Sequence, residues 1–161
     1  ADLPWISLDS LISGQGSRPL MRIFGELASS EQVSEINNLI LKNFSLRRVI
    51  ESVTILDTAK VINQVEQFLL RYEHLAGCDV PNDRKVALYV HISCLIERLI
   101  RNASPSHYSG RQCPQSELAT LREAFSVIES GYSVKIPVVE LCYIHDILTR
   151  ETEFIQEDQE F

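Results

Sequence analysis

The 161-residue sequence lacks the features that mark several classes of protein. With only six glycines and six prolines, it does not have the composition of a disordered or collagen-like chain. No apolar run reaches the roughly 20 residues that a membrane span needs, and the first residues lack the basic and apolar regions of a signal peptide. There is no initiator methionine, and the only methionine is Met21, so we interpret the chain as a piece of a longer, cytoplasmic protein without a membrane segment.

Basic residues are in deficit as well. Fifteen Lys and Arg stand against 22 Asp and Glu, and the formal net charge of −7 opposes binding to phosphate backbones and anionic membranes. We therefore expect no direct nucleic-acid binding. No two of the four cysteines form a Cys-x-x-Cys pair, so reduced thiols are expected rather than a disulfide framework.

What the sequence does contain is a series of helical patterns. Apolar residues recur at helical spacing, with capping residues before them and breakers after them, in residues 31–44, 58–76, 85–102, 116–130 and 138–156. We interpret the β-branched segment 45–57 as helix and connector, since no second strand could pair with it. The sequence predicts an all-α fold, a compact bundle of about five helices.

The first residues differ from the rest of the chain. Half of the glycines lie before residue 30, at Gly14, Gly16 and Gly25, which is typical of a linker with short helical pieces. We expect the opposite for 85–102, which is apolar nearly all round and should be the central buried helix. The predicted domains are an N-terminal helical and linker extension, 1–56, and the bundle, 57–161.

Four His/Cys pairs invite a metal-site interpretation, because three of them have helical spacing that would place both side chains on one face. The pairs are His74/Cys78, His91/Cys94, His107/Cys113 and Cys142/His145. Inert buried thiols explain them more simply, so neither metal nor cofactor is predicted. No nucleophile elbow, phosphate loop or zinc-protease motif occurs, and no enzymatic activity is predicted. A zinc-dependent fold or a small enzyme is the third hypothesis.

One histidine stands apart, because His91 lies in the most apolar predicted helix with Arg98 seven residues later on nearly the same stripe. Phosphorylation of the imidazole would add nearly two negative charges. A nearby guanidinium would stabilise those charges, while a packed helix interface would be pushed apart. The pair therefore has the properties of a switch, although a single histidine in a helix is often only structural.

Three blocks of sequence carry a resemblance to a known family. LYVHISCLIERLIRN (88–102) resembles the His-hydrophobic-x-x-x-Ile-x-Arg signature of the PTS regulation domain, the module through which the phosphotransferase sugar-uptake system controls transcription. With FSLRRVIESVTILD (44–57) and IPVVELCYIHDIL (136–148), it most resembles the C-terminal copy of that domain in LevR-type activators of the alternative sigma factor.

The resemblance implies a non-catalytic, five-helix domain that forms homodimers and regulates a transcriptional activator in response to sugar supply. It implies that His91 is phosphorylated by an enzyme IIB component or by the histidine phosphocarrier, with Arg98 as the accompanying cation. Glu140 and His145 are the implied neighbours of the phosphate site. Many members of the family carry a second histidine seven residues after a glutamate, and counting from Glu140 this position is Ile147. His145 lies two residues earlier, about 200° away around the helix, so we keep it as a neighbour of the site and not as a second phosphorylation site. The alternative is a purely structural dimerisation or docking bundle in which His91 is inert.

Overall fold

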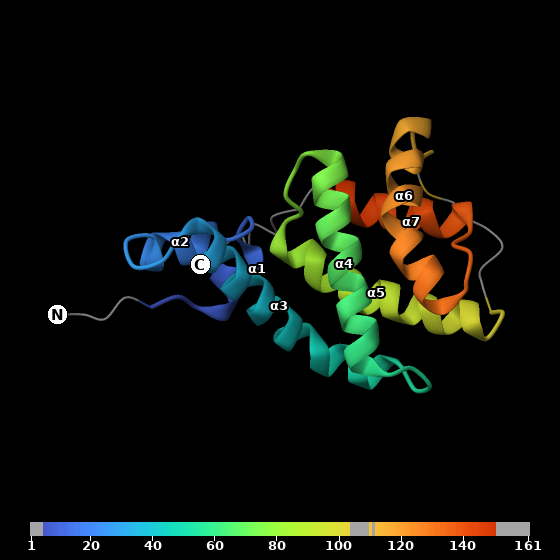
Figure 1. The fold of residues 1–161 in the computed structure, drawn as a ribbon, viewed down its shortest axis with the longest axis horizontal. Helices are drawn as coiled ribbons and strands as arrows, with labels where there is room; N and C mark the ends of the chain where they lie inside the picture. The colour runs from blue at the N-terminus through green and yellow to red at the C-terminus, as the bar shows by residue number, and fades with distance from the viewer. Residues whose placement is uncertain (1–4, 104–109, 111, 151–161) are drawn as a thin grey trace, which may run out of the picture.

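The computed structural model describes residues 5–103, 110 and 112–150, and every regular element in these ranges is an α-helix (Figure 1). The predicted all-α class is therefore confirmed. None of the helices described is long and apolar enough to cross a membrane. In chain order they are α1 (Leu8–Ser13), α2 (Arg18–Phe24), α3 (Ser30–Ser52), α4 (Thr58–Ala76), α5 (Asn82–Ile100), α6 (Gln115–Tyr132) and α7 (Val138–Thr149).

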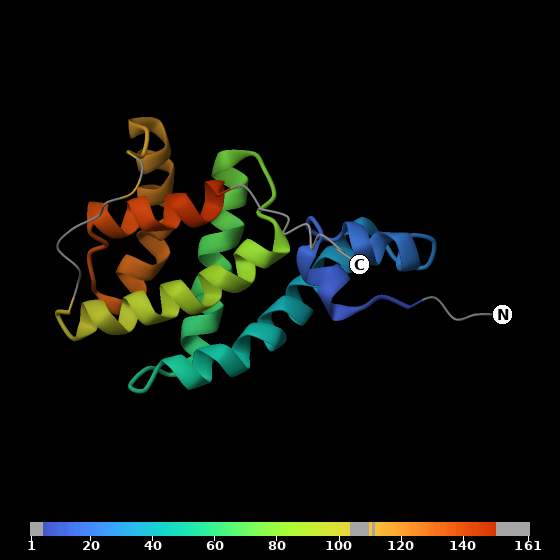
Figure 2. The same cartoon turned by 180° about the vertical axis from the view of Figure 1, so that it is seen from behind.

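Helices α4 to α7 form two crossed layers around the main core. Figure 1 shows α4 and α6 side by side, and Figure 2 shows α5 and α7 lying across them on the other side. The central helix is α5, which packs against α3, α4 and α7 and buries Leu88, Ile92 and Ile96 completely. These side chains share the core with Phe68 of α4 and Phe125 of α6, whose ring centroids are 4.3 Å apart.

Local signals set several helix ends. The sequence offers Asp57 or Thr58 as the cap of α4, and Asp57 takes this position by accepting hydrogen bonds from two backbone N–H groups of the first turn. Gly77 ends the same helix with a φ of 67°, which glycine adopts without a Cβ clash. The sequence predicts that the helix over 116–130 stops at Gly131, and this is wrong, because α6 continues to Tyr132 and Ser133 takes the left-handed conformation. Gly131 allows a close approach, since an added Cβ would lie 3.0 Å from the Gln64 side chain of α4.

Helix α3 is longer than the sequence predicts. We expected it to end near Phe44, but it continues without a break to Ser52. Complete burial of Val49 explains the difference, because tertiary packing outweighs the weak helix propensity of β-branched residues. Ile36 and Leu39, which recur at helical spacing with the buried Val33, are 40% and 58% exposed.

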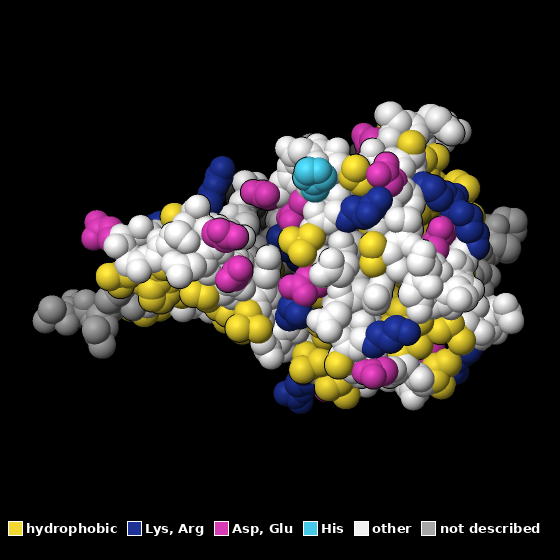
Figure 3. All heavy atoms as spheres, viewed as in Figure 1, with side chains coloured by type: hydrophobic (Ala, Val, Ile, Leu, Met, Phe, Trp, Pro, Cys, Tyr) yellow, Lys and Arg dark blue, Asp and Glu magenta, His cyan; other side chains and the backbone are white. Residues whose placement is uncertain are grey.

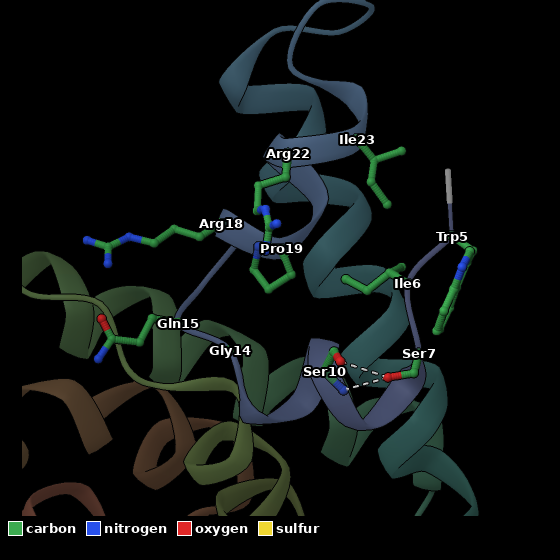
Figure 4. A pocket seen from close by; sticks show the side chains of 10 residues that line it. All are labelled: Trp5, Ile6, Ser7, Ser10, Gly14, Gln15, Arg18, Pro19, Arg22 and Ile23. Carbon is green, nitrogen blue, oxygen red and sulfur yellow. Dashed lines mark hydrogen bonds between the residues drawn. The ribbon is translucent and has the colours of Figure 1, made fainter. Parts of the chain in front are cut away.

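The first two helices form a small arm at the start of α5. Leu11, Leu20 and Val33 make up its separate apolar cluster. The buried Asn82 side chain connects the arm to the bundle by donating hydrogen bonds to the backbone carbonyl oxygens of Leu11 and Gly16, at 2.8 and 3.0 Å. A hollow of about 510 Å³ lies on this arm. Figure 4 shows the side chains that line it, from α2 and from the segment that leads into α1.

Helix α3 takes part in both apolar clusters. Its first half contributes Val33 to the cluster of the arm, and its end contributes Val49 to the main core, together with the C-cap residue Val53. The division of the chain into an extension, 1–56, and a bundle, 57–161, stays a prediction.

Candidate functional site

His91 and Arg98, the pair singled out by the sequence, lie two turns apart on α5. Most of the apolar residues of this helix pack inward, and the partly exposed side chains of His91 and Arg98 lie beside the packed face. The His91 side chain is 27% exposed and that of Arg98 is 36% exposed, so solvent reaches both. Seven residues correspond to about 10 Å along a helix, and a third group is needed to connect the pair.

That third group is Glu140 of α7. Pro137 occupies the N-cap of this helix, and Glu140 lies in the first turn with its side chain wholly buried. Arg98 donates a hydrogen bond from Nη2 to Glu140 Oε1 at 2.9 Å. His91 Nε2 lies 3.6 Å from the other carboxylate oxygen, Oε2. A single carboxylate on α7 therefore connects the two side chains of α5.

The Glu140 carboxylate is held in its charged form. Burial by itself would raise its pKa, but the interactions with His91 and Arg98 outweigh burial and keep the pKa below its ordinary value. Its position in the first turn of α7 adds to this effect, because the helix dipole favours a negative charge there. The site thus contains a fixed negative charge inside the fold, with an imidazole and a guanidinium between that charge and solvent.

Some polar atoms of the site have unused hydrogen-bonding capacity. His91 Nε2, Glu140 Oε2 and Arg98 Nε are buried and have no hydrogen-bond partner in the part of the chain that the structure describes. Because Arg98 Nε–H is a donor only, an added anion could supply the acceptor that it lacks. The ring of Tyr143, nearly one turn after Glu140, lies beside the imidazole with its centroid 6.3 Å from that of His91.

The structure brings His91, Arg98 and Glu140 together, but it places His145 in a different contact. His145 follows on α7, is only 8% exposed, and forms a hydrogen bond through Nε2 with Glu117 of α6. Its Nδ1 is buried and has no partner among the residues described. The two histidines therefore belong to two different helix interfaces, α5 with α7 and α6 with α7.

The three His/Cys pairs that lie wholly within the described residues do not form a recognisable metal centre. In the described ranges, no three His, Cys, Asp or Glu side chains come together in a way that could hold a metal ion. All four cysteines are unpaired thiols. Burial, with Cys142 and Glu117 nearby, raises the pKa of Cys113 to about 11, so its thiol is protonated at neutral pH. His107 lies outside the described residues.

The site falls within a segment that known proteins share. The profile of the PRD domain family matches residues 66–151, more than half of the 161-residue chain. This chain belongs to the PRD domain family. The part that matches the PRD domain begins within α4 and contains all four residues that the sequence proposed for the site: His91, Arg98, Glu140 and His145.

A curated protein is similar over nearly the whole chain. The transcriptional regulatory protein DagR of Salmonella typhimurium is 24% identical over 157 residues, an alignment that covers 91% of this PRD chain. The same alignment covers 16% of DagR, so the chain spans a small fraction of that relative's length. No solved structure matches the chain.

The spacing of residues in the sequence did not identify the glutamates that contact His91 and His145 in the structure. Glu140 entered only through the PRD resemblance, and Glu117 was not singled out. Glu140 lies 42 residues after Arg98 on another helix, and the periodicity of one helix carries no information about its neighbour. The available signal was the setting of Glu140, a carboxylate between Val139 and Leu141 in the first turn of an apolar helix.

Proposed function

We propose that this PRD domain is a regulatory module of a transcriptional activator, and that His91 accepts a phosphoryl group from a protein of the phosphotransferase system. The donor is an enzyme IIB component or the histidine phosphocarrier, so that phosphorylation follows sugar supply. Family membership and the similarity to a transcriptional regulatory protein support the regulatory role. The domain has no catalytic activity of its own in this proposal.

The observation that carries the proposal is the arrangement around His91. A partly exposed imidazole faces a wholly buried carboxylate that also binds Arg98. In the transfer, a nitrogen of the neutral imidazole forms a bond to phosphorus while the bond from phosphorus to the donor side chain breaks. The donor side chain keeps the electron pair of that bond. The guanidinium of Arg98 binds the same carboxylate as His91 and is itself partly exposed, so a turn of this side chain toward the phosphoryl group would balance part of the new negative charge.

Phosphorylation would change the balance of charge at the interface of α5 and α7. A phosphoryl group brings nearly two negative charges beside Glu140, which is already ionised. If Arg98 turns to the phosphate, Glu140 loses its hydrogen-bonded cation and remains a buried charge. Both effects weaken the packing of α7 on α5, so a local charge becomes a change in helix arrangement.

The test is phosphorylation with phosphoenolpyruvate, enzyme I and the phosphocarrier, with and without enzyme IIB. The wild type, His91→Ala and His145→Ala are compared by intact mass and by the acid lability of the added phosphate. We expect one acid-labile phosphate on the wild type and on His145→Ala, and none on His91→Ala. His145→Ala is the matched control, because it also removes an imidazole that contacts a glutamate.

Two outcomes would contradict the proposal. Phosphate that persists on folded His91→Ala would remove His91 from the role. An unmodified wild type with every donor would favour the second candidate, a structural dimerisation or docking bundle in which His91 is inert. The exposed apolar side chains of α3, among them Ile36 and Leu39, are the observation that favours this candidate.

A further inference from the structure

The hollow on the arm combines two arginines with apolar side chains. In Figure 4, Arg18 extends away on one side of the hollow, and the apolar side chains of Ile6 and Ile23 lie on the other. Figure 3 shows that hydrophobic side chains also gather along the lower edge of the arm. A surface of this kind fits a partner that carries both negative charge and apolar groups. We call it the arm hollow, which is lined by Trp5, Ile6, Arg18, Pro19, Arg22 and Ile23, among others.

The two arginines of the arm hollow, Arg18 and Arg22, have exposed side chains and form no ion pair with the residues that the structure describes. The acidic residues of the arm, Asp9 and Glu26, do not line the hollow. Other arginines of the described ranges do pair with a glutamate, namely Arg47, Arg71, Arg98, Arg101 and Arg122. The charge of Arg18 and Arg22 is therefore unmatched, in a chain whose formal net charge is −7.

The chain itself contains a segment with the complementary composition. Residues 151–161, ETEFIQEDQEF, follow α7 and carry five acidic residues and no Lys or Arg. Phe154 and Ile155 stand between two groups of these acidic residues. Carboxylates form charge-assisted hydrogen bonds with guanidinium groups, and an aromatic ring supplies a large apolar contact. We call residues 151–161 the acidic segment.

The acidic segment begins where the arm joins the bundle. Arg84, in the first turn of α5, donates hydrogen bonds to the backbone carbonyl oxygens of Leu148 and Arg150, just before the segment. Two residues earlier, the backbone N–H of Asn82 donates to the carbonyl oxygen of Gly14, another residue that lines the hollow. One turn of α5 thus holds both the arm and the end of α7. Eleven extended residues span up to about 36 Å, more than three times the roughly 10 Å length of α2.

We infer that the acidic segment binds in the arm hollow of its own chain. Its carboxylates lie beside Arg18 and Arg22, and Phe154 and Ile155 pack on the apolar side of the hollow. This contact ties the end of α7 to the arm across the start of α5. The arm hollow does not include His91, so the inference goes beyond the proposed function and does not depend on it.

The first experiment uses the fluorescence of Trp5, which is the only tryptophan of the chain, lines the arm hollow and is 82% exposed. The wild type is compared with a neutralised variant of the full chain. Its acidic segment carries Glu151→Gln, Glu153→Gln, Glu157→Gln, Asp158→Asn and Glu160→Gln. We expect the emission of the wild type at a shorter wavelength, because the bound segment shields Trp5 from water. The emission should not depend on protein concentration, because the contact is within one chain.

The second experiment titrates a synthetic peptide with the sequence of residues 151–161 and follows the same emission. The peptide should bind the neutralised variant and bind the wild type at least about tenfold more weakly, because the hollow of the wild type is already occupied. Adding Arg18→Gln and Arg22→Gln to the neutralised variant should raise the peptide Kd by at least about tenfold. Arg47→Gln with Arg48→Gln is the matched control, since it also removes two exposed arginines, and it should leave the Kd unchanged.

Circular dichroism establishes that each variant is folded. Equal emission of the wild type and the neutralised variant, or equal effects of the two arginine pairs, would overturn the inference. Emission that changes with concentration would indicate a contact between chains, and equal peptide affinity for both proteins would mean that the hollow is open to another acidic partner. Either result would also overturn it. Phosphorylation of the neutralised variant is measured in parallel and should equal that of the wild type, so that failure of this inference and failure of the proposed function are separate results.

Discussion

His91 and His145 each contact a glutamate of a neighbouring helix, but the two sites distribute burial in opposite ways. At the first site the imidazole is 27% exposed, and the Glu140 carboxylate is wholly buried. At the second site the His145 side chain is 10% exposed, and that of Glu117 is 48% exposed. Glu140 also binds Arg98, whose guanidinium reaches solvent.

From this difference we infer which histidine is better placed to accept a charge. At His91 part of the imidazole is exposed to solvent, although its Nε2 atom is buried, and the opposing carboxylate charge lies inside the fold. At His145 the imidazole is enclosed, and water screens the carboxylate that contacts it. We therefore expect His91 and its neighbours to control regulation, and the pair of His145 and Glu117 to contribute modestly to stability.

The largest effect is expected for Arg98→Met, which removes the guanidinium and keeps an apolar stem. The buried Glu140 charge is then left with His91 alone, so we expect a loss of about 2 kcal/mol in the free energy of unfolding, measured with urea at pH 7. Arg71→Met is the control, because Arg71 pairs with Glu123 on the surface and should lose less than about 0.5 kcal/mol. Equal losses for the two variants would contradict the special role of the buried carboxylate.

A smaller effect is expected when the charge of Glu140 is removed by acid. Its pKa in the folded protein lies below the ordinary 4.5, so the unfolded chain takes up the proton first as the pH falls. The stability that this ionisation contributes is complete above pH 4.5 and is lost as the pH falls through the lower folded pKa. Urea unfolding between pH 7 and pH 3 should show the advantage of wild type over Glu140→Gln shrinking on acidification. An advantage that is constant or grows would mean that the sign is wrong.

The smallest effect is expected for Glu117→Gln. Its half-exposed carboxylate interacts with His145 in contact with water, so the loss in unfolding free energy should be below about 1 kcal/mol. Phosphorylation of His91 should be unchanged in this variant. A loss as large as that of Arg98→Met would show that the two histidine sites are energetically alike, and the comparison would fail.

Sequence patterns predict the helices of this protein where one face is apolar and the opposite face is polar. For α4, Val61, Val65 and Phe68 share one face, and the helix lies where the periodicity and the cap at Asp57 place it. For α3 the prediction was partly wrong, because the helix has apolar residues on two sides. Periodicity alone cannot show that Val33 faces the core while Leu39 faces solvent.

The same limit applies to the candidate site. The spacing of His91 and Arg98 on one helix is visible in the sequence, because both residues belong to the same periodic element. The position of Glu140 between them depends on how α7 crosses α5, and that of Glu117 depends on how α6 meets α7. These crossings result from packing of whole helix faces, which the spacing within one helix does not encode.

The most direct test is the urea unfolding midpoint of the phosphorylated and unphosphorylated forms of wild type and Glu140→Gln. Phosphate on His91 adds negative charge beside an ionised, buried carboxylate, so phosphorylation should lower the midpoint of the wild type. In Glu140→Gln the carboxylate charge is absent, and most of this decrease should disappear. An equal decrease in both proteins, or no decrease in the wild type, would contradict a switch that acts through Glu140.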